Sequence, residues 1–411
     1  MRPPSPRSSS DFWRLWGAAT ASNLGDGIRL TALPLAAVAV TTDPLAVSGV
    51  TAASFAPWLV LALVGGAIAD RFDRRRLIVT GQVVRTVAVA GFAAAVAAGH
   101  AGLAAIYAIA VIIGVGEVVV DSAVLAAVPR VAGDDLDRAN SRFTAAQFIT
   151  NDAAGGPLGG LLYSVAPALP FVVDAVSFAV GIPLMASVSV PLQNTSAGPG
   201  PTISRLWDDI VEGARFLADD GLLAGLAAAV AISNLADAAS RSLMVILVTD
   251  QLGGGGVAFG LVIATAAIGG SGGAALGPRL VGAVGRRAVL VGAFVVLGAG
   301  TAAMATAGRV ELVAAGSTVA MFAVGAFTVA NHSVRQHLTP DHLLGRVTAT
   351  ARLLALGAVP LGALGGGLLA RQIGVRSTML ASAAVSAGIA LLVARVTSGR
   401  ALDLELEKES G

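Results

Sequence analysis

The chain has 411 residues, of which 55% are hydrophobic and 13% are charged, whereas soluble domains carry about 25% charged residues. Too few charged side chains are present to cover the surface of a soluble protein of this length. The sequence has no cysteine and four histidines, which excludes disulfides, thiolate metal sites and a cysteine nucleophile and argues against a metalloenzyme.

The basic residues do not form a surface for a nucleic acid. The formal net charge is +2, and Lys408 is the only lysine. The arginines fall in short loops between apolar segments instead of along one face, so we expect no nucleic-acid partner. A phosphate-binding loop for ATP needs a lysine in a glycine-rich turn, and this sequence has none. We therefore expect neither a cofactor nor a metal.

Apolar segments of about 20 residues or more, each able to cross a hydrocarbon core about 30 Å thick, recur along the chain. They predict an all-α integral membrane protein that contacts the lipid bilayer through twelve transmembrane helices. The predicted spans are 14–40, 45–69, 77–98, 101–128, 142–164, 168–189, 221–249, 257–282, 287–306, 310–336, 346–370 and 376–396.

The longest polar stretch lies between the sixth and seventh spans. Residues 191–202 are rich in proline and glycine and predict a linker, and 203–219 predict an amphipathic helix on the membrane surface. Its apolar face would carry Leu206, Ile210, Ala214 and Leu217. The predicted domains are a six-helix bundle at 1–190, a linker at 191–220, a second six-helix bundle at 221–396 and a tail at 397–411.

The arginine distribution predicts the orientation. Loops on the side of the amino terminus carry most of the arginines, and those on the opposite side carry only Arg309, Arg371 and Arg376. Because positive loops are retained in the cytoplasm, both termini are expected to be cytoplasmic, with the chain in the cell membrane. The first span is too long and polar for a cleaved signal peptide.

The two halves repeat each other. Asn23 and Asp26 recur as Asn234 and Asp237 at an offset of 211 residues, and the pair 75–76 recurs as 286–287 at the same offset. Duplicated halves joined by a linker are typical of transporters that move two bundles about a site near the middle of the membrane.

The loop after the second span carries the strongest local motif. Residues 66–76, Gly-Ala-Ile-Ala-Asp-Arg-Phe-Asp-Arg-Arg-Arg, resemble the loop signature of the major facilitator superfamily. Residues 212–217, 340–347 and 360–367 are similar to its drug and siderophore exporter branch, which includes enterobactin exporters and macrolide efflux proteins. The resemblance implies the major facilitator fold of two pseudo-symmetric six-helix bundles.

The same resemblance implies a latch on the cytoplasmic side. Its residues would be Gly66, Asp70, Arg71, Arg74 and Arg75. In the family the aspartate contacts the start of span 11, which here begins at residues 345–347. Asp70 itself follows the negative carboxyl end of its own span, which also favours a partner at another helix's amino terminus. For the arginines, the alternative is simple positive anchoring.

Span 5 contains a glycine-rich segment similar to the antiporter signature but one residue shorter. Gly156 and Gly160 would allow close approach of a neighbouring helix, and Pro157 would let the helix bend. The alternative is tight packing without a role in coupling.

Seven ionisable residues stand out within the predicted spans, where each charge near the middle of the membrane costs about 2.5–3.5 kcal/mol on insertion scales. Asp26 and Arg29 can pair at a spacing of three, and Asp237 and Arg241 at a spacing of four. Asn23 and Asp26 recur in the second half as Asn234 and Asp237. The candidates for a cavity or gate are therefore Asn23, Asp26, Arg29, Asn234, Asp237 and Arg241. The alternative is a pair of structural ion pairs.

Glu117 and Asp121 share one face of span 4 and have no basic residue within that span. Two close carboxylates disfavour double ionisation, so one of them is expected to hold a proton and to couple transport to protons. Cation binding and buried hydrogen bonding are the alternatives. The seventh residue is Asp152.

These observations predict a secondary transporter that exports small amphipathic compounds, drug-like or siderophore-like, by alternating access. The proton gradient would supply the energy, and we expect a monomer. The alternatives are a lysophospholipid or nutrient transporter of the same fold and a transport-dead scaffold or sensor.

Overall fold

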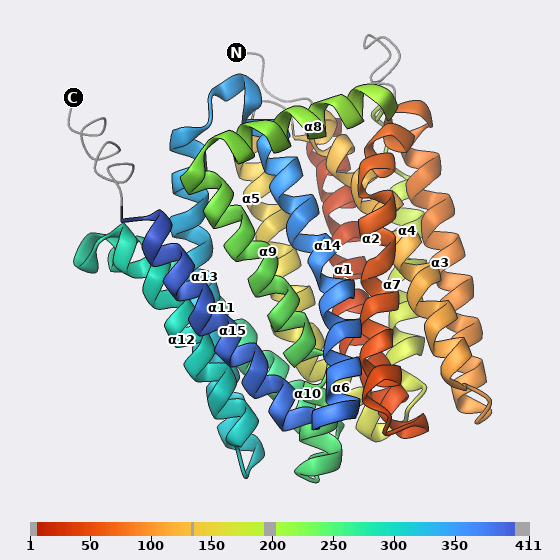
Figure 1. The fold of residues 1–411 in the computed structure, drawn as a ribbon. Coiled ribbons are helices and arrows are strands. Elements are labelled where there is room, and N and C mark those ends of the chain that lie inside the picture. Colours follow the sequence, from red (N-terminus) through yellow and green to blue (C-terminus); the bar gives the residue numbers. More distant parts are fainter. Residues whose placement is uncertain (1–5, 133–134, 193–202, 399–411) are drawn as a thin grey trace. The chain divides into compact units, whose positions relative to one another are not determined.

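The computed structural model describes residues 6–132, 135–192 and 203–398, except for the side chains of 6–9, 62–71, 137, 152, 203–206 and 341. Its regular elements are helices (Figure 1). In chain order they are α1 (Pro6–Val40), α2 (Pro44–Arg71), α3 (Arg74–Ala97), α4 (Leu103–Val131), α5 (Leu136–Gln147), the π-helix η1 (Phe148–Ala154), α6 (Gly155–Val165), α7 (Leu169–Ala186), α8 (Ile203–Asp219), α9 (Gly221–Arg241), α10 (Met244–Ile246), the π-helix η2 (Leu247–Gln251), α11 (Gly256–Val284), α12 (Arg286–Thr306), α13 (Val310–Leu338), α14 (Asp341–Ile373) and α15 (Val375–Val396).

The chain divides into two compact units. The first comprises residues 1–41, 53–206 and 255–261, and the second comprises 42–52, 207–254 and 262–411. The main boundary therefore falls inside α8, and each unit includes one short segment from the other half of the sequence. Those segments are the start of α2, in the second unit, and the start of α11, in the first.

Within the described residues, ten helical stretches are long and apolar enough to cross a membrane. They account for ten of the twelve predicted spans, and the all-α membrane fold is confirmed. The span predicted at 14–40 is helical as α1 but carries Asp26 and Arg29. The span predicted at 142–164 is divided among α5, η1 and α6, each shorter than 18 residues. The first of these two spans differs from the other ten by its charged residues, and the second by the interruptions in its helix.

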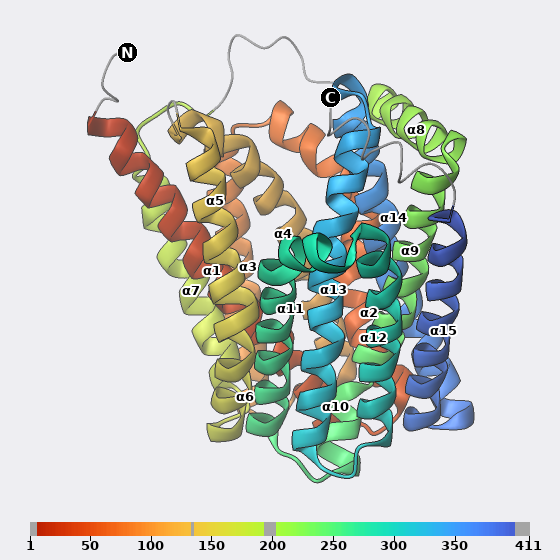
Figure 2. The ribbon, with the colours of Figure 1, turned by 90° about the vertical axis from the view of Figure 1, so that its left-hand side faces the viewer.

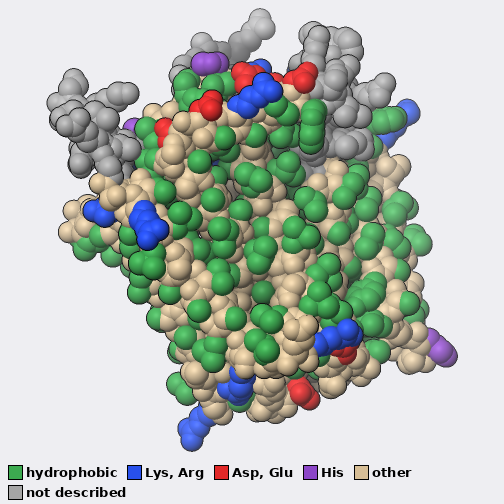
Figure 3. Space-filling view, in the orientation of Figure 1, with side chains coloured by type: hydrophobic (Ala, Val, Ile, Leu, Met, Phe, Trp, Pro, Cys, Tyr) green, Lys and Arg blue, Asp and Glu red, His purple; other side chains and the backbone are tan. Residues whose placement is uncertain are grey.

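The surface of the helices fits a lipid environment. Many large apolar side chains are exposed on them, including Val84, Val87, Leu261 and Leu391. In the space-filling view, hydrophobic side chains cover most of the visible face, and the charged side chains gather near its two ends (Figure 3). An apolar surface of this size would be unfavourable in water and is favourable in hydrocarbon.

Glycines bring α1 close to α6 in the first unit. A Cβ atom at Gly155 would come within 2.6 Å of Gly27 Cα, and one at Gly159 within 2.5 Å of the Ile28 carbonyl oxygen. Only hydrogen fits at these positions. This contact fixes the part of α1 that carries Asp26 and Arg29.

The next face of α6 packs on the start of α11, within the same unit. A Cβ atom at Gly260 would come within 2.6 Å of the Gly156 carbonyl oxygen, and one at Gly160 would collide with the backbone of Gly256. The predicted close approach at Gly156 and Gly160 is therefore present. Pro157 cannot donate to the carbonyl of residue 153, and the adjoining π-helix η1 changes the hydrogen-bond spacing at this point.

In the second unit, α9, α12, α13 and α15 share an apolar core. The amphipathic helix predicted at 203–219 is confirmed as α8. Part of its apolar face packs on protein, because Leu217 is buried with Leu343 and Val347 of α14. Arg346 also pairs with Asp209 and Glu212 of α8, at 2.8 and 2.6 Å. Figure 2 shows α8 beside α14. Protein therefore covers part of the face that was expected to contact lipid.

Candidate functional site

A buried ion pair on α1 is the start of the site. Asp26 and Arg29 are 4% and 1% exposed, and Arg29 Nη2 donates to Asp26 Oδ1 at 2.8 Å. The pairing predicted from their spacing of three residues is present. Because both groups are removed from solvent, the pair needs further partners to offset the loss of hydration.

Arg85 of α3 supplies a second cation to the same carboxylate. Its Nη2 lies 2.5 Å from Asp26 Oδ1, and its Nη1 donates to Ser22 Oγ at 3.1 Å. The guanidinium carbon lies 3.8 Å from the centre of the Phe178 ring, a cation–π contact. Arg85 is fully buried, so these contacts replace its hydration.

Two further carboxylates reach Arg29 from other helices. Glu117 of α4 accepts a hydrogen bond from Arg29 Nη2 at 3.4 Å, and Asp174 Oδ2 of α7 lies 3.3 Å from Arg29 Nε. Asp174 is fully buried, whereas the Glu117 side chain is 21% exposed. Arg29 therefore contacts carboxylates from three helices, and Glu117 is the member of this group that solvent reaches.

We call Asp26, Arg29, Arg85, Glu117 and Asp174 the five-charge cluster. It joins two guanidinium groups to three carboxyl groups. If all five were ionised, the cluster would carry a net charge of −1. An uncompensated charge in a low dielectric is costly, so such a site favours the uptake of one proton or of one cationic group.

Two members of this cluster, Arg85 and Asp174, are not among the residues predicted from the sequence. Arg85 lies inside the predicted span 77–98 and Asp174 inside 168–189, so the rule that selected Asp26 also applies to them. Glu117 has no basic residue within its own span, but α1 brings Arg29 to it. Asp121 lies one turn further along α4 and is half-buried.

The second unit has a simpler arrangement. Arg241 Nη1 lies 3.6 Å from Asp237 Oδ2, with side chains 52% and 27% exposed, and 3.8 Å from Met321 Sδ. Asn234 donates to the Ala355 carbonyl of α14 at 2.9 Å. Asn23, its counterpart in the first unit, is half-buried on α1.

The repeat therefore preserves the polar positions but not the cluster. At the offset of 211, Arg85 corresponds to Val296 and Glu117 to Thr328. The second unit thus lacks equivalents of the cation on α3 and of the carboxylate on α4. The four-residue motif alone could not reveal this asymmetry.

The predicted latch is only partly within the described structure. The side chains of Gly66, Asp70 and Arg71 lie outside the described residues. Arg74 donates to the carbonyls of Ala126 and Leu192 at 2.7 and 3.0 Å, and Arg75 donates to that of Val190 at 3.2 Å. These two arginines hold the chain after α7 to the start of α3.

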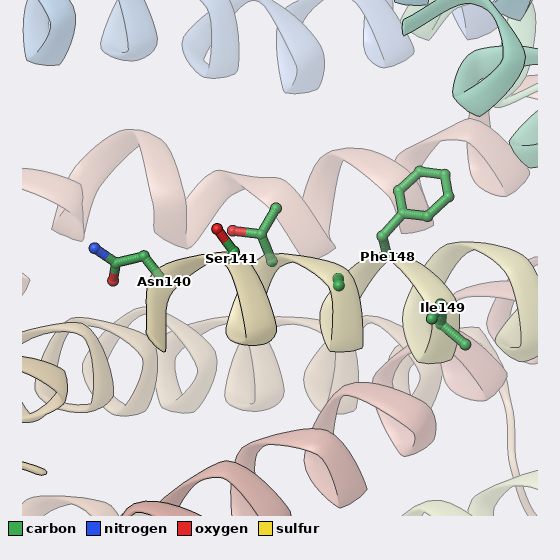
Figure 4. Close-up of a pocket in the computed structure, with 6 residues that line it drawn as sticks. Asn140, Ser141, Phe148 and Ile149 are labelled. Atoms are coloured by element: carbon green, nitrogen blue, oxygen red, sulfur yellow. The ribbon is translucent and has the colours of Figure 1, made fainter. Parts of the chain in front are cut away.

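A pocket runs along one face of α5 and η1 in the first unit. Its volume is about 740 Å³, within the range of drug-sized sites. Asn140, Ser141, Phe148 and Ile149 project from this helix (Figure 4), and Thr144 and Ala145 complete the described lining. No member of the five-charge cluster is among these lining residues. Amide and hydroxyl groups followed by apolar side chains suit an amphipathic molecule.

Another ion pair, in the second unit, joins Asp43, outside the membrane-spanning segments, to the last turn of α14. Arg371, at the end of α14, donates to both carboxylate oxygens of Asp43, and its Nε lies 2.6 Å from Oδ1. The hydrogen bonds from Arg371 hold the pKa of the Asp43 carboxyl below its ordinary value, and the Leu45 backbone N–H acts in the same direction. This contact attaches the connection between α1 and α2 to α14.

Removing the cation on α3 should destabilise the protein strongly. We expect Arg85→Gln to cost about 3–5 kcal/mol, because it leaves the buried Asp26 carboxylate with one cation fewer. The matched control is Arg241→Gln, whose half-exposed pair should cost at most about 1 kcal/mol. Thermal unfolding in detergent, followed by tryptophan fluorescence, measures both. Equal shifts in melting temperature would contradict the assignment.

The ion pair of Asp43 with Arg371 should add a small amount to the free energy of unfolding, and this contribution should disappear in acid. Because the pKa of Asp43 is lowered, its contribution is present above the ordinary aspartate value of about 3.9 and is lost as the pH falls through the lowered pKa. Arg371→Gln should therefore cost up to about 1 kcal/mol at pH 7 and nothing once Asp43 is protonated. Melting temperatures across the pH range test this. Asp43→Asn should remove the effect of Arg371→Gln, and a loss that persists in acid would contradict the pairing.

Comparison with known proteins agrees with the fold. The family model described as "Transmembrane secretion effector", MFS_3, matches residues 2–409. The multidrug efflux pump Tap of Mycobacterium tuberculosis is 28% identical over 406 residues, covering 92% of each chain. An uncharacterized MFS-type transporter of the same organism, Rv0037c, is 37% identical over 98 residues, so the match spans only 23% of this chain and 22% of that relative.

The architecture has close counterparts among solved structures. The crystal structure of a mutant of the nucleoside transporter NupG superposes with a TM-score of 0.75 at 12% identity, covering 94% of this chain and 100% of that one. At that identity the likeness concerns the fold alone. The family match along nearly the whole sequence places the chain in the transmembrane secretion effector family of the major facilitator superfamily of transporters.

Proposed function

We propose that this transporter exports small amphipathic organic compounds in exchange for protons by alternating access. The observation that carries the proposal is the five-charge cluster, in which three carboxyl groups, two of them buried, face two buried guanidinium groups. Ionisable groups inside membrane proteins are costly and commonly mark ion or substrate paths. A cluster short of one positive charge can accept either a proton or a cationic ligand.

Glu117 is the cluster member that a ligand can reach. Its side chain is 21% exposed, whereas the side chains of its four partners are at most 5% exposed. A cationic group that approaches Glu117 would supply the missing charge, and a bound proton would then be released. Competition for one negative charge is sufficient to couple the two flows in opposite directions.

The pocket on α5 and η1 supports the proposed substrate class. Its described lining combines Asn140, Ser141 and Thr144 with Phe148 and Ile149, which suits a compound with both polar and apolar parts. The relatives named multidrug efflux pumps support an exported, drug-like substrate. A siderophore-like compound remains within the same class of amphipathic solutes.

The proposal includes location and energy source. The arginine-rich loops support cytoplasmic termini and a location in the cell membrane. One charge that moves through 100 mV provides about 2.3 kcal/mol, enough to drive accumulation without a nucleotide. The chain is proposed to work as a monomer.

Transport by inverted vesicles tests the proposal. The panel contains ethidium, a macrolide and a catecholate, each with and without an imposed pH gradient. A gradient of one pH unit, coupled to one proton, supports at most about ten-fold accumulation, since one unit is worth about 1.36 kcal/mol. Wild type should accumulate at least one compound in this way, and collapse of the gradient should abolish the accumulation.

Glu117→Gln should abolish gradient-driven accumulation and retain downhill exchange, because the carboxylate through which the ligand displaces the proton of the cluster is lost. The matched control is Glu311→Gln, at an exposed glutamate in the first turn of α13, which should behave as wild type. Accumulation by Glu117→Gln equal to that of wild type would exclude Glu117 from coupling. Wild-type transport without any dependence on pH would exclude proton exchange.

A further inference from the structure

Asp174 occupies a setting that does not suit a carboxylate anion. It lies on α7 and is fully buried. Oδ2 is 3.3 Å from Arg29 Nε, but neither carboxyl oxygen accepts a hydrogen bond from any residue that the structure describes. Oδ1 faces the backbone of α1, where a side chain at Gly25 would collide with it. An ionised carboxylate normally has several donors in such a place.

The two arginines cannot neutralise all three carboxyl groups. Arg85 is committed to Asp26 by its contact at 2.5 Å and is held there by Ser22 and the Phe178 ring. Arg29 is then the one cation left for both Glu117 and Asp174. One of these two carboxyl groups must be neutral if the cluster is to carry no net charge.

The geometry distinguishes the two candidates. Glu117 accepts a hydrogen bond from Arg29 and is partly exposed, and both features stabilise an anion. Asp174 has neither feature. We propose that Asp174 is the neutral member of the cluster and holds the coupling proton of the resting transporter, while Glu117 stays ionised and faces the ligand.

The surroundings of Asp174 support this assignment on every packed helix. It faces Asp26 and Arg29 from α1, Arg85 from α3 and Glu117 from α4. The helix α6, which also packs on α7, contains no charged residue. Of the four charged groups, two are acidic and two are basic, so their effects on Asp174 oppose each other, while its complete burial favours the neutral acid.

The assignment gives the exchange a physical route. When Asp174 loses its proton, its new negative charge competes with Glu117 for Arg29, and the hold on Glu117 weakens. Glu117 is then free to pair with a cationic ligand. Conversely, a ligand cation bound at Glu117 makes Arg29 available to an ionised Asp174. This step rests on the proposed function; the protonation of Asp174 in the resting protein does not.

Infrared spectroscopy of the purified protein at pH 7 tests the protonation directly. A protonated carboxyl group gives a C=O band separate from those of carboxylates, and exposed aspartates are ionised at this pH because their pKa is about 3.9. The band should shift when the wild type is labelled with carboxyl-¹³C aspartate and not when it is labelled with carboxyl-¹³C glutamate. A band that follows the glutamate label, or no band at all, would overturn the proposal.

Variants then locate the aspartate. Asp174→Asn should remove the band and fold with an unchanged melting temperature, because the amide matches a neutral acid in shape. Asp237→Asn, at the half-exposed aspartate of the second unit, should leave it in place. Asp174→Glu should transfer the band to the glutamate label. A band that persists in Asp174→Asn, or failure of that variant to fold, would contradict the assignment.

The two proposals can fail separately. If the band belongs to Asp174 but vesicle transport ignores the pH gradient, the proposed function is wrong and the neutral aspartate is structural. If transport depends on the gradient but Asp174 is ionised, the coupling proton lies on another group. The spectroscopic result does not depend on any assumption about the substrate.

Discussion

The contacts of Arg29 with three carboxyl groups organise the first unit. One guanidinium on α1 reaches Asp26 on its own helix, Glu117 on α4 and Asp174 on α7. Removing any of these charges from water is costly, so the helices gain by staying together around Arg29. The cluster has one positive charge too few, so the uptake of one proton or of one cationic group neutralises it.

Close backbone contacts allow Arg29 to contact all three carboxyl groups. Glycines at 27, 155 and 159 allow α1 to lie against α6 without intervening side chains, and this fixes the turn of α1 that carries the two charges. Arg85 adds rigidity, because it is held by Asp26, Ser22 and Phe178 at once. The contacts that change on proton exchange are therefore limited to those among Arg29, Glu117 and Asp174. Such a site can change its protonation without losing its structure.

Much of the fold follows from sequence because its signals are local. The length and apolarity of the segments predict membrane helices, and a spacing of three residues predicts the pair of Asp26 with Arg29. The convergence of Arg85, Glu117 and Asp174 depends on how α3, α4 and α7 pack against α1, and no local pattern encodes that. The internal repeat also misleads here, since Asp237 occupies a half-exposed pair while Asp26 is buried between two arginines.

The central claim is that the five-charge cluster exchanges a proton for a ligand, and proton release on ligand binding tests it most directly. Ethidium is added to purified protein in weakly buffered detergent, and the change in pH is recorded with binding measured in parallel. We expect wild type to release about one proton per bound ligand and Asp174→Asn to bind without release. Equal release from the two proteins would contradict the claim and place the exchanged proton outside the cluster.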